Sequence, residues 1–109
     1  MAFGFRTRNP ARDSQTDAAR FGRLTTMLDE LLEELEAEST GLQARYQRVA
    51  DNAAFSLEEF ENEQAEALSE RTDELTASLI ACSNRLVSLQ KQAAFLRRLR
   101  DEVVDFRPA

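Results

Sequence analysis

The chain contains no histidine, no tryptophan and a single cysteine among its 109 residues. The absence of histidine excludes imidazole as a general base or metal ligand, and a lone Cys82 excludes an internal disulfide. The sequence also lacks a nucleophile elbow, a phosphate-binding loop and a dinucleotide fingerprint. We therefore expect a non-enzymatic protein with no catalytic residue, no metal site and no cofactor.

Residues that interrupt helices are also scarce. The chain has three glycines and two prolines, and Gly41 is the only one of them between Arg23 and Arg107. Alanine, leucine, glutamate, glutamine and arginine dominate that span, and these residue types lose little free energy on entering a helix. The composition predicts an all-α protein built from long helices of the coiled-coil type.

Long apolar runs are absent as well. No stretch of about 18 apolar residues occurs, so we expect no segment that spans a membrane. The first residues, Met1–Arg6, lack the apolar core of a secretory signal. A single thiol fits a reducing compartment, and we expect a cytoplasmic protein.

The net charge of −6 is distributed unevenly along the chain. Residues 1–12 carry +3, residues 13–50 carry −4, residues 51–76 carry −8, and residues 77–109 carry +3. An acidic middle is therefore flanked by two basic ends. We interpret the acidic side chains as a solvated helix face, because di-iron carboxylate sites on helices also require histidine.

Apolar residues recur every seven positions in two parts of the chain, as they do in coiled-coil helices. The line of contact that this pattern predicts between the helices is called the seam from here on. The predicted seam consists of Phe21, Leu24, Leu28, Leu31, Leu35, Leu42, Val49, Leu68, Leu75, Leu79, Cys82, Leu86 and Leu89. Within this pattern Cys82 is expected to be a small buried hydrophobe and not a reactive thiol.

The two heptad patterns are out of register by two residues, a shift that a continuous coiled coil does not absorb well. Ser56 and Glu59 have the spacing of a capping box, and Phe55 and Phe60 stand where its hydrophobic staple would lie. We therefore predict a turn before Ser56 and an antiparallel helical hairpin. Its expected parts are a flexible basic tail over 1–13 and a hairpin domain over 14–106, with a helix over about 14–50, a turn over about 51–55 and a helix over about 56–106. One continuous helix in a parallel dimer and a three-helix arrangement broken at Gly41 remain as alternatives.

A turn near residue 53 would make the second helix longer than the first and leave its end without a partner. That end carries an apolar stripe, and soluble monomers rarely leave such a stripe in water. Its candidate interface residues are Phe95, Leu96, Leu99, Val103 and Phe106. A second copy, the tail residues Phe3 and Phe5, or another protein would cover it. We favour a second copy, which predicts a homodimer or small homo-oligomer that forms a helical bundle.

Two functional hypotheses follow from this reading. In the first, the chain is a protein–protein interaction, scaffold or adaptor module that acts through coiled-coil helices and self-association. In the second, it is a chaperone-like or membrane-peripheral module that docks a client helix or an anionic bilayer through its basic and apolar end. A membrane surface is not favoured, because an ordinary dimer interface explains the same residues.

Nucleic acid is not expected as a partner. A basic cluster near the C-terminus has the charge to contact phosphates. However, Arg97 and Arg98 each have an acidic residue four positions further on, and the chain as a whole is acidic. The cluster consists of Lys91, Arg97, Arg98 and Arg100.

Overall fold

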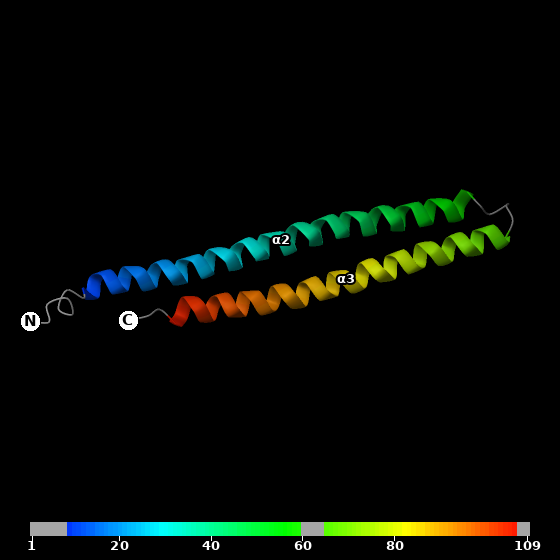
Figure 1. Cartoon of the computed structure of the whole chain (residues 1–109). Helices are drawn as coiled ribbons and strands as arrows, with labels where there is room; N and C mark the ends of the chain where they lie inside the picture. The colour runs from blue at the N-terminus through cyan, green and yellow to red at the C-terminus, as the bar shows by residue number, and fades with distance from the viewer. Residues whose placement is uncertain (1–8, 60–64, 107–109) are drawn as a thin grey trace, which may run out of the picture. The chain divides into compact units, whose positions relative to one another are not determined.

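The computed structural model of the chain describes residues 9–59 and 65–106, without the side chains of residues 55–59 and 65–68. The described residues form two α-helices, α2 (Pro10–Glu59) and α3 (Ala65–Phe106). The helices run in opposite directions (Figure 1). The predicted all-α helical hairpin is thus confirmed.

Helix α2 begins four residues earlier than the sequence suggested. The Asn9 side-chain oxygen accepts a hydrogen bond from the Ala11 backbone N–H at 2.9 Å, and the Asn9 carbonyl accepts one from Asp13 at 3.0 Å. Asn9 is therefore the N-cap and Pro10 the first helical residue, where a proline loses no hydrogen bond. Residues 10–13, expected to belong to a flexible tail, are helical, and residues 1–8 lie outside the described residues.

The far end of α2 also differs from the expectation. The turn predicted over residues 51–55 is helical, and Ser56, the predicted start of the second helix, lies inside α2. A hydrogen bond of 2.9 Å from Gln47 Nε2 to Asp51 Oδ1 spans the expected boundary at helical spacing. Alanines and glutamates dominate this stretch and favour a continued helix, so a capping motif alone does not end it.

The predicted cap residues lie at the edge of the described part of the chain. The side chains of Phe55, Ser56 and Glu59 are not among those described, and Phe60 lies outside the described residues. Helix α2 ends at Glu59 and α3 begins at Ala65.

Gly41 does not interrupt α2, which rules out the break that the three-helix alternative required.

The contacts divide the chain into two compact units, each built from a part of both helices. Among the described residues, unit 1 joins residues 10–34 of α2 to residues 93–106 of α3. Unit 2 joins residues 35–59 of α2 to residues 65–92 of α3. Each unit is described separately below.

Burial along the helices follows spacings of three and four residues, as in a coiled coil. Among the described side chains, Leu28 in unit 1 and Leu89 in unit 2 are the buried hydrophobic ones, with 4% and 0% of their surface exposed. Most of the other inward positions are half-buried, and Tyr46 is 38% exposed. In heptad notation, the d positions are Phe21, Leu28, Leu35, Leu42 and Val49 of α2 and Leu75, Cys82, Leu89, Leu96 and Val103 of α3. The a positions are Thr25, Leu32, Ser39, Tyr46 and Ala53 of α2 and Leu79, Leu86, Ala93 and Arg100 of α3.

Two residues of the predicted seam lie elsewhere. Leu24 and Leu31 are 40% and 39% exposed, and the neighbouring Thr25 and Leu32 take the inward positions. Thr25 fits there because its hydroxyl donates to the Phe21 carbonyl at 2.9 Å, which satisfies the polar group within the helix. The side chain of Leu68, also predicted in the seam, is not among those described.

Candidate interaction surface

In unit 1, the first contact between the helices joins two aromatic rings. The rings of Phe21 and Phe106 lie 5.4 Å apart between centroids, at an interplanar angle of 24°. This stacking places the C-terminal end of α3 beside the first part of α2. The expectation that α3 would extend beyond α2 is therefore wrong, since Phe106 has a partner within its own chain.

The second contact in unit 1 is an ion pair. Arg100 Nε donates to Asp29 Oδ1 at 2.5 Å, and the hydrogen bond from Arg100 to the carboxylate raises the pKa of the guanidinium. Arg100 occupies an a position, where the sequence pattern called for an apolar residue. The arginine stem covers the seam while its charged end reaches Asp29, an e position of α2.

The two flanks of the seam in unit 1 differ in character. Residues at g and c positions lie on one side of an antiparallel pair, and residues at e positions lie on the other. The e side carries the charged Asp29 and Arg97. The g and c side carries six apolar side chains, which we call the apolar face. It consists of Leu24, Met27 and Leu31 of α2 and Phe95, Leu99 and Phe106 of α3.

Most of the apolar face is open to solvent. Met27 is 59% exposed, Phe95 is 56% exposed and Phe106 is 65% exposed. Leu99 is half-buried, and Leu24 and Leu31 are the two exposed leucines already described. Apolar side chains left in water are unfavourable, which makes this face a candidate interaction surface.

The apolar stripe predicted from the sequence is split by this geometry. Leu96 and Val103 are half-buried at d positions, whereas Phe95, Leu99 and Phe106 belong to the apolar face. The contribution of α2 to the face was not predicted from the sequence. The signal was present, because Leu24, Met27 and Leu31 are spaced by three and four residues and so share one side of a helix.

Unit 2 has its own cross-helix ion pair, at g positions of both helices. Arg85 donates through Nε to Glu38 Oε2 at 2.6 Å and through Nη2 to Oε1 at 3.0 Å. This two-point hydrogen bond lowers the pKa of Glu38 and raises that of Arg85. The g side of unit 2 is therefore charged, while the g side of unit 1 is apolar.

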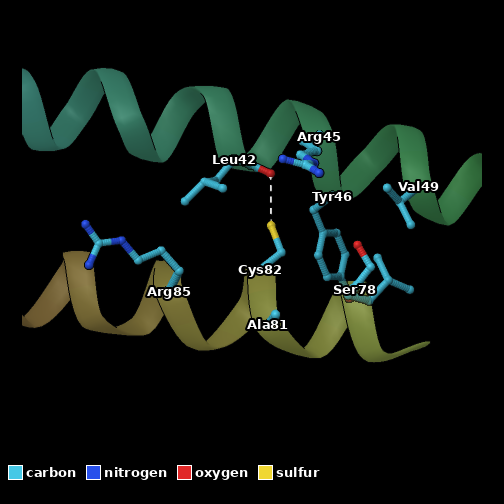
Figure 2. Close-up of a pocket in the computed structure, with 9 residues that line it drawn as sticks. Leu42, Arg45, Tyr46, Val49, Ser78, Ala81, Cys82 and Arg85 are labelled. Atoms are coloured by element: carbon cyan, nitrogen blue, oxygen red, sulfur yellow. Dashed lines mark hydrogen bonds between the residues drawn. The ribbon is translucent and has the colours of Figure 1, made fainter. Parts of the chain in front are cut away.

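Unit 2 also contains an open groove of about 230 Å³ between the helices. Figure 2 shows the Tyr46 ring reaching from α2 towards Ser78 of α3, and the Cys82 thiol pointing at the Leu42 carbonyl. Cys82 Sγ donates to that carbonyl at 3.3 Å. The half-buried thiol thus packs in the seam, and the groove walls offer no paired acid, base and nucleophile among the described residues.

Metal-binding clusters and membrane-spanning stretches are absent from the described part of the chain. In residues 9–59 and 65–106, no group of three or more acidic, cysteine or histidine side chains is placed to hold a metal ion. Neither helix, over its described residues, has a stretch apolar and long enough to cross a membrane. No protein-family model matches the chain, and neither a curated protein nor a solved structure does.

Proposed function

We propose that the chain is a non-enzymatic, cytoplasmic protein–protein interaction module, a scaffold or adaptor that docks a helical partner on the apolar face of unit 1. The observation that supports this proposal is the one-sided exposure of apolar side chains. Met27, Phe95 and Phe106 are each more than half exposed on one flank, while the opposite flank carries the Asp29–Arg100 ion pair.

The energetics of the hairpin support the same proposal. A pair of helices buries few side chains by itself, and a cooperative fold of this size usually needs more apolar contact than two helices supply. Covering a leucine or phenylalanine that is now exposed would contribute about 1.5–3 kcal/mol per side chain at full burial. A partner helix laid along the apolar face would supply that burial.

A photo-reactive amino acid placed at Phe95 tests this proposal in cells that express the full chain. The matched control carries it at Arg97, which lies two residues away on the polar flank of the same helix and is also exposed. We expect a protein adduct of defined mass from position 95 and little from position 97. The adduct should disappear when Met27→Asp is introduced on the other helix of the face.

Equal labelling from both positions, or labelling unaffected by Met27→Asp, would contradict the proposal. The membrane-peripheral alternative is tested by flotation of the purified chain with vesicles of anionic phospholipid. We expect no flotation. Flotation that is lost in Phe95→Asp would instead support a bilayer as the occupant of the face.

A further inference from the structure

We propose that the occupant of the apolar face is the same face of a second copy, packed antiparallel about a two-fold axis that passes beside Met27. This inference rests on the proposed function and names the partner. Three properties of unit 1 support it: the area of the face, the order of charges along α2, and the positions of two phenylalanines on α3.

The area of the face matches what a dimer requires. Five side chains of the face are between 39% and 65% exposed. A buried aromatic side chain removes about 150–250 Å² from water, so these fractions correspond to roughly 500 Å² of apolar surface. A standard interface buries about 800 Å² on each partner, and about 65% of a homodimer interface is apolar. The apolar part of such an interface is therefore also about 500 Å².

The charges on α2 are ordered so that the face complements itself. Arg20, Met27 and Glu34 are seven residues apart at c positions, so they lie along one line of the helix with Met27 midway. When α2 packs antiparallel on α2 of a second copy with Met27 at the axis, Arg20 of each copy lies beside Glu34 of the other. Arg20 forms an exposed ion pair with Asp17 at 3.8 Å, with 65% of its side chain exposed, and an exposed pair of this kind is weak enough for Arg20 to exchange it for Glu34 of the second copy.

The same axis brings the leucines of the face together. Leu24 lies three residues before Met27 and Leu31 lies four residues after it. In the antiparallel arrangement, Leu24 of one copy therefore packs next to Leu31 of the other. A two-fold interface requires such self-complementarity, since each residue on one copy must suit its symmetry partner.

Helix α3 independently points to the same axis. The Phe21–Phe106 stack and the Asp29–Arg100 ion pair place Met27 level with about residue 101 of α3. Phe95 and Phe106 lie about equally far on either side of that level. An axis through Met27 therefore also sets Phe95 of one copy beside Phe106 of the other, where aromatic pairs stabilise an interface.

A cysteine at the axis tests this geometry in the full-length chain. In a Cys82→Ala background, which removes the native thiol, Met27→Cys should form a disulfide-linked dimer on mild oxidation, because the two cysteines meet at the axis. Thr26→Cys in the same background is the control, since Thr26 is exposed and next to Met27 in the chain but occupies a b position, on the other flank of the seam. We expect most of the Met27→Cys chain to be linked and little of the control.

Charge reversal tests the order of charges by sedimentation equilibrium. Arg20→Glu or Glu34→Arg alone sets like charges together at two places in the dimer and should weaken association by about tenfold or more. The double variant Arg20→Glu/Glu34→Arg exchanges the two signs and should restore the original dissociation constant. Circular dichroism of each variant verifies that the helices are retained.

Several results would overturn the two-fold arrangement. These are a monomeric mass at all concentrations, equal linking of Met27→Cys and Thr26→Cys, or a double charge variant as weak as the single ones. A protein adduct at Phe95 in cells, combined with a monomeric purified chain, would reject the second copy and leave the proposed function standing. No protein adduct at Phe95 in cells, together with a Met27-linked dimer of the purified chain, would instead reject the proposed function and leave the two-fold dimer standing.

Discussion

Arg100 Nε lies 2.5 Å from Asp29 Oδ1 and joins residues that are 71 positions apart in the chain. Both side chains are partly exposed, at 38% and 47% of their surface. The arginine takes a seam position that the heptad pattern assigns to an apolar residue. This ion pair therefore joins α3 to α2 in unit 1 and allows a charged residue in the seam.

Exchange of these two charges should preserve the contact. Asp29→Arg alone sets two guanidinium groups together and should lower the melting temperature, and Arg100→Asp alone should do the same with two carboxylates. The double variant Asp29→Arg/Arg100→Asp should recover much of the loss. Thermal unfolding followed by circular dichroism measures this, and the differences should shrink in high salt, which screens exposed charges. A double variant no more stable than either single variant would show that the pair does not matter.

Leu89 is expected to be the most sensitive position in unit 2. Its side chain is fully buried, so Leu89→Ala should reduce the free energy of unfolding by about 2–5 kcal/mol. Val87→Ala is the control on the same helix, because Val87 is 47% exposed and its loss should change stability by about 0.5 kcal/mol or less. Urea denaturation at a fixed protein concentration gives both values. Similar effects of the two substitutions would contradict the burial described for Leu89.

Gly41 is expected to be a position where stability can be gained. It lies inside α2 with open space where a Cβ would be, so Gly41→Ala adds no clash. The alanine should stabilise the helix by about 0.5–1 kcal/mol, because glycine loses more backbone freedom on folding. Ala44→Gly, at an exposed position one turn further on, should have the opposite effect. Destabilisation by Gly41→Ala in the same urea experiment would show that α2 bends there.

The stabilisation from Glu38 should depend on pH. The hydrogen bond from Arg85 lowers the pKa of Glu38, so the folded state favours the charged carboxylate. Its contribution is therefore present above the ordinary glutamate pKa and is lost as the pH falls through the lowered value. Glu38→Gln should be less stable than the parent chain at about pH 7, and the difference should be smaller at about pH 3.

The matched control for this experiment is Glu36→Gln, two residues away and also exposed. It should show little change between the two pH values relative to the parent chain. A difference between Glu38→Gln and the parent that persists unchanged at the acid end would exclude the carboxylate charge as its cause. The magnitude should be small throughout, as it is for exposed ion pairs.

The sequence predicts α3 better than α2, for a physical reason. On α3 the apolar residues keep to d positions without interruption from Leu75 to Val103, so their spacing defines one side of the helix. On α2 the leucines at 24 and 31 are more apolar than Thr25 and Ser39, which occupy the seam. Hydrophobicity alone therefore selects the wrong neighbour at Thr25, whose hydroxyl donates to its own helix and so faces the seam without an unsatisfied polar group.

Neither the position of the turn nor the apolar face could be predicted from local sequence motifs alone. Ser56 and Glu59 match a capping box, but residues 50–59 all continue the helix, and a cap contributes only about 1 kcal/mol. Misplacing the turn then shifted the whole pairing, so Phe106 was expected to overhang instead of stacking on Phe21. The face formed jointly by Met27 and Phe95 becomes visible only when that pairing is known.

The two cross-helix ion pairs have a consequence for how the chain finds its native alignment. Coiled-coil seams repeat every seven residues, so sliding one helix by a heptad again sets apolar side chains against apolar side chains at modest cost. The charges repeat less completely: a heptad slip in either direction would move Glu38 from Arg85 to Ser78 or Gln92, and a slip in one direction would move Asp29 from Arg100 to Ala93. The Glu38–Arg85 pair therefore disfavours a slip of unit 2 in both directions, and the Asp29–Arg100 pair disfavours a slip of unit 1 in one direction. A chain lacking both pairs should populate slipped alignments more than the native sequence does.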